Sequence, residues 1–340
     1  MDDIVNNLLK EYYTKEKYPF GIFNTSPVNT SPVKDIFENE NNNPHPEKQY
    51  LQLIRDILER GSDEVGRNGS VRTIFGHSMR FSLKDGELPL LTTKKLAYKA
   101  CFHELMWFLS GSTDNKKLQE KGVHIWDGNS SSDFLKNRTK KTDTINKELK
   151  EGDIGPGYGF QWCHWGAEYE NCKTDYTGKG INQIQRLIDD LKDPDKRSSR
   201  RLILSAWNVE EIDNMALPPC HILCQFHVKE GQYLSCCLFQ RSADVGLGMP
   251  FNIASYSFLT HILAKHTGLI ADEFVYFVGN AHIYHNHLEP LKQQLEKKPF
   301  DFPKIRIKTI HEKIESYELD DIEWITPYLS HEKIGMEMTA

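Results

Sequence analysis

The chain has 340 residues, of which 39% are hydrophobic and 26% charged, and its formal net charge is −6. This composition is ordinary for a globular protein and excludes the broad basic surface of a nucleic-acid-binding protein, so any phosphate must be bound by a few local arginines. No stretch of about 18 apolar residues occurs, and no apolar segment follows Met1-Asp2-Asp3, so we expect a cytoplasmic protein with no membrane partner.

Residues 1–47 differ in composition from the rest of the chain. They repeat the pentapeptide Asn-Thr-Ser-Pro-Val at 24–28 and 29–33 and then continue as a polar stretch. Such low complexity predicts a flexible extension that contributes nothing to the core. We expect a single folded domain over residues 48–340, with no further boundary inside it.

The apolar pattern of residues 48–340 predicts both helices and strands. Spacings of three and four residues predict helices over residues 49–61, 96–109, 181–191, 252–266 and 283–294. Alternation predicts strands over residues 71–81, 202–207, 222–228, 233–240 and 305–310. Glu230-Gly231 is predicted as a hairpin turn, and the Lys-rich segment 136–151 as a surface loop. These elements indicate a mixed α/β (α+β) fold.

Cys220 stands between two predicted strands, after two prolines and before His221. A rigid scaffold commonly presents a reactive side chain at such a position, although the local sequence alone favours a buried structural thiol. The chain has seven cysteines, an odd number without zinc-ligand spacing, which indicates reduced thiols and no metal site. A nucleophilic cysteine needs a nearby cation, because a free thiol with a pKa of about 8.5 is only slightly ionised at neutral pH.

Four arginines are candidates for that cation or for binding a phosphate. Arg67 lies in a glycine-rich turn, Arg200 and Arg201 precede a predicted strand, and Arg241 follows one. The planar guanidinium suits phosphate oxygens, and Ser242 adds a hydroxyl, whereas a surface salt bridge is the alternative for each arginine. Arg200 and Arg201 would point to opposite faces if both lay in a strand, so they would serve one site from two directions or another subunit.

Four more side chains are candidates for chemistry or binding. Glu104 lies in the apolar stretch 103–109. Its carboxylate is therefore either paired with another group or has a raised pKa that suits a general acid and base. Asn252 is either the N-cap of an apolar helix or a reader of a uracil edge, because its amide offers one acceptor and two donors. His282 and Tyr284 would lie on the same side of a strand or extended turn, where they could bind sugar hydroxyls.

Several short motifs occur together and in one order. They span residues 66–73, 103–109, 125–127, 155–159, 199–201, 219–221, 240–244, 250–256 and 282–284. Taken together they closely resemble the folate-dependent thymidylate synthase family over residues 48–340. The resemblance implies a single domain with a large, mixed, bent β-sheet packed by helices, one sheet face lying at a homodimer interface. It also weakens the structural interpretation of Cys220, because a buried thiol explains none of the other motifs.

The resemblance implies conversion of dUMP to dTMP, with methylenetetrahydrofolate giving both the carbon and the hydride and with no metal or NAD(P). It implies that Cys220 attacks C6 of the uracil and makes C5 a nucleophile. Glu104 would act through ordered water in the proton transfers, with Tyr158 and His221 in support. The implied catalytic residues are Cys220, Glu104, Tyr158, His221, Asn252 and Arg241.

The same resemblance implies two sets of binding residues. Those for dUMP are Arg67, Arg200, Arg201, Cys220, Gln240, Arg241, Ser242, Ala243, Asp244, Asn252, His282, Ile283 and Tyr284. Those for folate are Lys94, Ile125, Trp126, Asp244, Leu247, Gly248, Phe251 and Thr339. Asn252 favours uracil, because the related deoxycytidylate hydroxymethylases tend to carry Asp there, whose carboxyl suits cytosine.

The implied partners are dUMP, folate and a second copy of the chain. In an obligate homodimer Arg200 and Arg201 would reach the phosphate bound by the partner subunit. Residues 328–340 would form a lid over folate, and Thr339-Ala340 depart from the usual family ending, which bears on closure. Gly157, Cys163 and Gly335 also depart from the family pattern, at positions where a Val, a basic residue and a Lys are common, and none of them removes a catalytic role.

Overall fold

The computed structural model describes residues 44–66, 68–139 and 148–338. Contacts divide the chain into residues 1–44 and 45–340. The predicted extension over residues 1–47 lies almost wholly outside the described residues. Its last residue, Glu47, is buried, and its carboxylate accepts hydrogen bonds from the backbone N–H groups of Thr92 and Thr93, each at 2.8 Å. The folded unit therefore starts a few residues before position 48, because these two N–H groups are satisfied by Glu47.

A six-stranded mixed sheet forms the centre of the domain. Its strand order is β1-β2-β6-β5-β4-β3, with β5 and β6 parallel and all other neighbours antiparallel. The strands are β1 (Ser62–Gly66), β2 (Gly69–Ser82), β3 (Ile203–Ser205), β4 (His221–Lys229), β5 (Tyr233–Asp244) and β6 (Ile270–Tyr284). A separate pair consists of β7 (Ile305–Ile307) and β8 (Ile322–Trp324). The mixed sheet confirms the predicted fold class.

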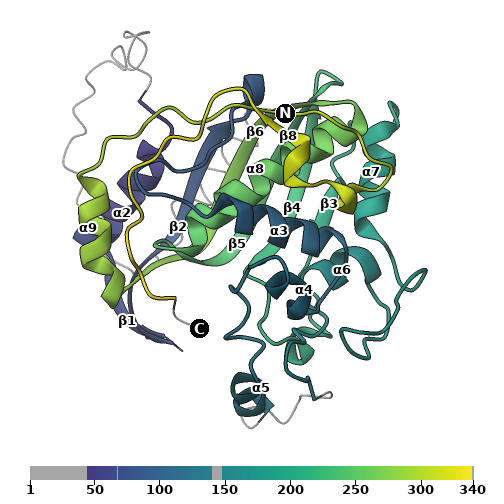
Figure 1. Ribbon diagram of the computed structural model, residues 1–340, viewed down its shortest axis with the longest axis horizontal. Coiled ribbons are helices and arrows are strands. Elements are labelled where there is room, and N and C mark those ends of the chain that lie inside the picture. The colour runs from purple at the N-terminus through teal and green to yellow at the C-terminus, as the bar shows by residue number, and fades with distance from the viewer. Residues whose placement is uncertain (1–43, 67, 140–147, 339–340) are drawn as a thin grey trace, which may run out of the picture. The chain divides into compact units, whose positions relative to one another are not determined.

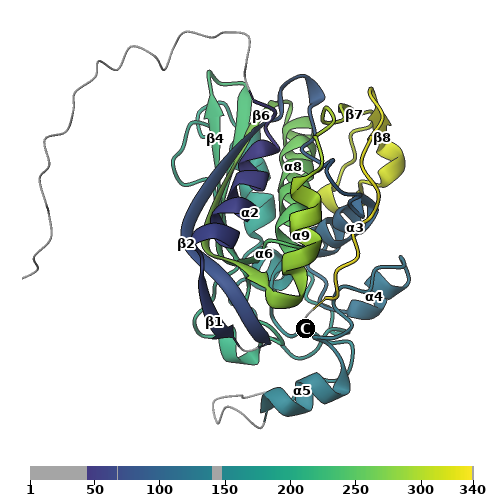
Figure 2. The same ribbon diagram turned by 90° about the vertical axis from the view of Figure 1, so that its left-hand side faces the viewer.

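Most of the helices gather on one face of this sheet, as Figures 1 and 2 show. They are α2 (Lys48–Arg60), α3 (Tyr98–Leu109), α4 (Asn115–Gln119), α5 (Ser132–Thr139), α6 (Gly159–His164), α7 (Gln183–Lys192), α8 (Gly248–Thr267) and α9 (Leu288–Leu295). Helix α8 is buried almost throughout and connects the parallel strands β5 and β6, as a crossover connection requires. The core therefore lies between α8, its neighbouring helices and the inner face of the sheet.

The outer face of the sheet carries apolar side chains away from the helices. Phe239 on β5 and Phe277 on β6 are neighbours in the register, and their rings stack at 5.0 Å with an interplanar angle of 13°. They are 42% and 38% exposed, and Ile203 on β3 is 42% exposed. Such large apolar side chains on a sheet face are typical of an interaction surface.

Most predicted elements are confirmed, but strand β6 was not predicted, and two other predictions differ from the structure. The hairpin between β4 and β5 is present, with positive φ at Glu230 and Gly231. The helix predicted over 283–294 was wrong at its start, because the chain remains in strand β6 through Tyr284 and α9 begins at Leu288. The predicted surface loop was wrong over Lys136–Thr139, which are helical in α5, and residues 140–147 lie outside the described residues.

Candidate active site

Two pockets adjoin on the helical side of the sheet, and Cys220 lines both. We call the first the polar pocket; it has a volume of about 540 Å³ and includes Gly66, Asn68, Cys220, Arg241, Ser242, Asp244, His282 and Tyr284. We call the second the apolar pocket; it has a volume of about 440 Å³ and includes Glu104, Ile125, Trp126, Tyr158, Cys220, His221, Leu247, Phe251 and Asn252. Most of the predicted candidates are thus brought together from segments far apart in the sequence.

Cys220 is held by its backbone at the entrance to β4. Its N–H donates to the hydroxyl of Tyr158 at 2.9 Å, and its carbonyl accepts from the N–H of Arg241 at 2.9 Å. The Arg241 guanidinium in turn donates to the carbonyls of Pro219 at 2.9 Å and Pro218 at 2.7 Å. The prolines restrict the backbone of this loop, and the guanidinium places a positive charge beside it.

Tyr158 connects Cys220 with the aromatic wall of the apolar pocket. Its ring is buried, stacks on Phe108 at 4.7 Å and contacts the rings of Trp126 and His221, both at 5.5 Å. Its φ of 37° lies in a region that non-glycine residues rarely adopt, a strain that costs about 1–3 kcal/mol. Such strain persists only where the surrounding packing stabilises it. Here the strained backbone places the Tyr158 hydroxyl within hydrogen-bond distance of the Cys220 N–H.

Glu104 is a buried carboxyl on the face of α3 that lines the apolar pocket. The indole N–H of Trp126 donates to its Oε1 at 2.7 Å. Burial raises the pKa of Glu104 to about 7, and the Trp126 hydrogen bond opposes that rise. Of the two interpretations left open by the sequence, the structure favours the shifted carboxyl, because no cation is paired with Glu104 among the described residues.

His221 is a neutral imidazole next to the site. Burial lowers its pKa to about 4, which outweighs the opposing effect of a hydrogen bond with Asn252. Its Nδ1 is buried and has no hydrogen-bond partner within the described residues. Near neutral pH the ring therefore carries no charge, and its Nδ1 is available for one hydrogen bond with a bound molecule or water.

Asn252 lies inside helix α8, four residues after its first residue, Gly248. The N-cap interpretation was therefore wrong, because the cap position belongs to Leu247. The Asn252 Oδ1 accepts from Gln240 Nε2 at 3.0 Å, and the same nitrogen donates to the Ser242 carbonyl at 2.9 Å. Because a backbone carbonyl can only accept, this contact fixes the orientation of the Gln240 amide.

The structure also shows where the remaining predicted residues lie. Lys94 is in the wall of the apolar pocket, but its ammonium is buried and donates to the Gly246 carbonyl; burial lowers its pKa to about 8. Ala243 is buried within β5 and Ile283 within β6. Arg67 and Thr339 lie outside the described residues.

Arg200 and Arg201 are both exposed in a turn before β3, and neither lines the polar or the apolar pocket. They were expected to face opposite ways if they lay within a strand, and they do not lie within one.

Several residues at or under the pockets were missed by the sequence analysis. Asn129 and Leu217 line both pockets, Tyr276 donates to Gln240 Oε1 at 2.6 Å, and His287 lies within 3.7 Å of Asp244. Leu217 directly precedes the two prolines, so its position was available as a signal. The other three act through contacts that no local pattern encodes.

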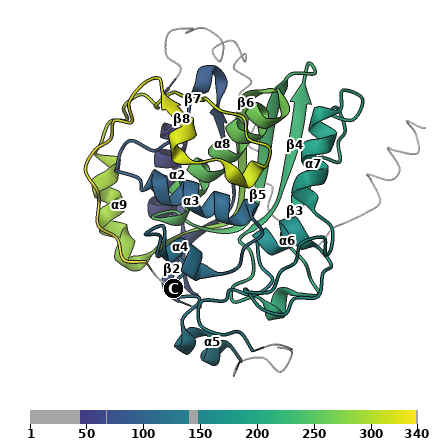
Figure 3. The ribbon, with the colours of Figure 1, turned by 45° about the vertical axis from the view of Figure 1, so that its right-hand side comes forward.

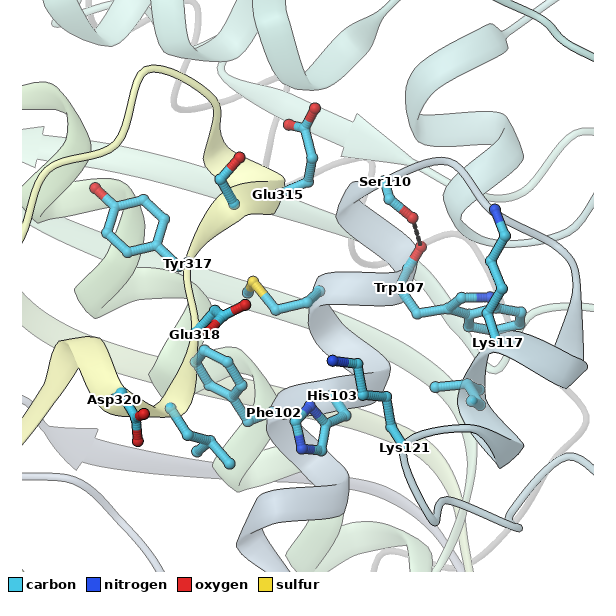
Figure 4. A pocket seen from close by; sticks show the side chains of 14 residues that line it. Phe102, His103, Trp107, Ser110, Lys117, Lys121, Glu315, Tyr317, Glu318 and Asp320 are labelled. Atoms are coloured by element: carbon cyan, nitrogen blue, oxygen red, sulfur yellow. Dashed lines mark hydrogen bonds between the residues drawn. The ribbon is translucent and has the colours of Figure 1, made fainter.

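A third pocket, of about 370 Å³, lies on the side of α3 that faces away from the apolar pocket (Figure 4). Glu318 and Asp320 line one side of it, Lys117 and Lys121 line the other, and the ring of Phe102 lies between them in the view. None of the predicted catalytic residues lines this third pocket, so it is not the site that contains Cys220.

No group of three metal-binding side chains occurs within the ranges that the structure describes. Over the same ranges, no helix is long and apolar enough to cross a membrane.

The chain is similar to known proteins over most of its length. A profile of the thymidylate synthase family matches residues 48–340. The chain is 49% identical over 300 residues to thymidylate synthase of Homo sapiens, covering 87% of this chain and 92% of the relative. It is 47% identical over 298 residues to thymidylate synthase of human herpesvirus 8 type P (isolate GK18), covering 87% and 85%. It is also 47% identical over 298 residues to a bifunctional dihydrofolate reductase-thymidylate synthase of Zea mays, covering 87% of this chain and 55% of that protein.

Proposed function

This chain belongs to the thymidylate synthase family, and we propose that it converts dUMP to dTMP with methylenetetrahydrofolate, releasing dihydrofolate. The observation that carries this proposal is that Cys220 lines both the polar and the apolar pocket. A nucleophile at this junction can attack a substrate held in one pocket while the carbon that it activates faces a second substrate in the other.

The polar pocket suits a nucleoside monophosphate. Arg241 and Ser242 offer a guanidinium and a hydroxyl to the phosphate, and His282 and Tyr284, whose rings lie 5.3 Å apart, face the deoxyribose hydroxyl. At the base end, Asn252 offers the donors of its amide nitrogen and the acceptor of its amide oxygen, which also accepts from Gln240 Nε2. This pairing matches the carbonyl and N–H of uracil.

In the proposed chemistry the Cys220 thiolate forms a C–S bond to C6 of dUMP. The electron pair of the C5–C6 double bond then moves toward C5 and the adjacent carbonyl, so that C5 becomes a nucleophile. Glu104 has a pKa of about 7, so about half of it is ionised at neutral pH and it can both accept and donate protons through water. Neutral His221 and the Tyr158 hydroxyl orient that water by hydrogen bonds.

The apolar pocket suits a reduced folate, which supplies one carbon and a hydride when bound. Trp126, Leu247 and Phe251 offer apolar walls to its rings, and the Asp244 carboxylate offers acceptors to the N–H groups of the pterin. The glutamate tail needs cations, and the buried ammonium of Lys94 is already used by Gly246. Lys95 and Lys333 also line this pocket and are exposed, so they are better placed than Lys94 for that role.

The active form is proposed to be a homodimer in which Arg200 and Arg201 serve the partner's polar pocket. Both side chains are exposed, and neither lines the polar or the apolar pocket of its own chain. The exposed, stacked Phe239 and Phe277 on the outer sheet face support burial of this face against a second copy.

The activity is tested by mixing the full-length protein with dUMP and methylenetetrahydrofolate and following dihydrofolate by absorbance. The wild type and Cys172→Ser should both form dihydrofolate, because Cys172 lines neither pocket, whereas Cys220→Ser should form none. A wild type that forms no dihydrofolate would refute the proposed function. A dCMP control, which should not react, tests the assignment of Asn252.

Subunit complementation tests the homodimer. Cys220→Ser and the double variant Arg200→Glu/Arg201→Glu should each be inactive alone. When they are mixed under conditions that exchange subunits, half of the dimers are mixed, and each has one complete site, so activity should return to about a quarter of the wild type. No recovery in demonstrably mixed dimers would mean that the arginines act within their own chain.

A further inference from the structure

His287 is a fully buried imidazole between Asp244 and the C-terminal segment. It ends the short 3-10 turn His285–His287 before α9 and is 0% exposed. Its Nε2 donates to the backbone carbonyl of Glu337 at 2.7 Å, and its Nδ1 lies 3.7 Å from Asp244 Oδ1. The C-terminal segment passes beside α9 before it reaches this contact (Figures 1 and 3).

These two contacts define the favoured protonation state of the ring. A carbonyl only accepts, so Nε2 must carry a proton, and a neutral ring would then direct the lone pair of Nδ1 toward the Asp244 carboxylate. A second proton replaces this repulsion by attraction. Burial by itself lowers the pKa of His287, but the interaction with Asp244 and the hydrogen bond to Glu337 together raise it, against a smaller effect of Lys94.

The surroundings are built to accommodate this contact. The Gly246 N–H donates to Asp244 Oδ1 at 2.8 Å, and the Lys94 ammonium donates to the Gly246 carbonyl. A Cβ at Gly246 would lie 2.8 Å from His287 Nδ1 and 3.1 Å from Met336 Sδ. Only glycine therefore lets the imidazole, the carboxylate and the C-terminal segment meet at this point. The ring of Tyr284 meets His287 edge-on at 5.6 Å.

We propose that His287 is the positioning residue that ties the C-terminal segment to Asp244 and so holds both over the bound folate. This inference rests on the proposed assignment of the apolar pocket to folate. Lys333, Ile334 and Met338 of the segment line that pocket, so an anchor at Glu337 determines how the pocket is covered. The positively charged ring donates one N–H to the C-terminal segment and attracts the Asp244 carboxylate through its charge. This couples the position of the segment over the pocket to Asp244, the proposed pterin-binding group.

The coupling has a defined pH dependence. Because the folded protein raises the pKa of His287 above its ordinary value of 6.5, the attraction between the charged ring and Asp244 is fully present below that value and is lost as the pH rises through the raised pKa. The neutral ring keeps only the hydrogen bond from Nε2 to the Glu337 carbonyl. Asp244 and Lys94 are the other charged groups that face this ring, and the fixed Glu337 carbonyl does not titrate. Folate binding should therefore weaken on the alkaline side while dUMP binding does not.

The test compares His287→Gln with the control His285→Gln. Glutamine keeps an N–H donor but cannot be charged, and His285 is a partly exposed neighbour paired with Asp63 on the surface. His287→Gln should raise the KM for methylenetetrahydrofolate about tenfold and remove its rise with pH, leaving the KM for dUMP within about twofold. Amide hydrogen exchange of residues 333–338, with dUMP and tetrahydrofolate bound, should also become faster. His285→Gln should match the wild type in all three.

A second measurement needs no His287 variant. The imidazole of His287 is titrated by NMR in the wild type and in Asp244→Asn, where its pKa should fall because the charge that holds the second proton is gone. An unchanged pKa in Asp244→Asn, or a wild-type folate KM and exchange rate in His287→Gln, would overturn the role of His287. A wild type that forms no dihydrofolate would instead refute the proposed function, so the two failures are distinguishable.

Discussion

The hydrogen bond from Trp126 to Glu104 controls the ionisation of the proposed general acid and base. Trp126→Phe keeps an aromatic ring in the wall of the apolar pocket but removes the N–H that now donates to Glu104 Oε1 at 2.7 Å. Burial raises the pKa of Glu104 and this hydrogen bond opposes the rise. Its removal should therefore raise the pKa further and leave less of the carboxylate at neutral pH.

The size of the effect follows from the burial of the pair. A hydrogen bond to a charged group contributes about 1.5–3 kcal/mol, and solvent does not screen this one, because Glu104 is only 6% exposed. Since about 1.4 kcal/mol is a factor of ten, the ratio of carboxylate to acid should fall about 10- to 100-fold at any pH. The wild-type group, with a pKa of about 7, is about half ionised at pH 7, so kcat there should fall about 5- to 50-fold.

The assay is kcat for dihydrofolate formation between about pH 5.5 and 9.5, at saturating dUMP and folate. In Trp126→Phe the acid limb should move to higher pH, and kcat should recover on the alkaline side. The matched control is Trp107→Phe, because the Trp107 indole is also buried but donates to the carbonyl of Asp114. An acid limb that stays in place in Trp126→Phe, or that moves equally in Trp107→Phe, would refute the reasoning.

Two further substitutions test the packing and the base-reading contacts. Gly159→Ala would place a Cβ 2.4 Å from a backbone carbonyl of α3, whereas at Gly157 the nearest atom is 3.9 Å away. The free energy of unfolding measured in urea should therefore fall by about 1–3 kcal/mol in Gly159→Ala and hardly at all in Gly157→Ala. Equal losses in the two variants would contradict the steric argument. Tyr276→Phe leaves Gln240 Oε1 without its 2.6 Å donor, so the orientation of Asn252 should loosen and the ratio of kcat/KM for dUMP over dCMP should fall about tenfold, with an unchanged ratio contradicting this role.

Much of the fold could be predicted because local patterns agreed with the final structure. Helix α7 has buried Ile184, Leu187, Ile188 and Leu191 on one face, which is the spacing visible in the sequence. Strand β6 was missed because it is buried at most positions on both faces near its centre, so it shows no clean alternation. Its last residues were therefore assigned to the following helix.

The candidate site was partly predictable for a different reason. Cys220, Glu104 and Asn252 each left two interpretations open, and only their common occurrence with the other motifs favoured chemistry. The structure removed the N-cap interpretation of Asn252, since the residue lies inside α8. It also changed the expectation for Lys94, because the loop that carries it turns the ammonium inward onto Gly246.

The sequence by itself determined which residue types are present for the chemistry: a cysteine behind two prolines, a carboxyl in an apolar helix and arginines before and after strands. Only the tertiary structure decided their states, because a pKa, a hydrogen-bond orientation or a contact such as that of His287 with Asp244 depends on groups that are distant in the chain. Burial moves the pKa of Glu104 to about 7, against the opposing effect of the hydrogen bond from Trp126. The same carboxyl in water would be fully ionised at that pH and could not donate a proton.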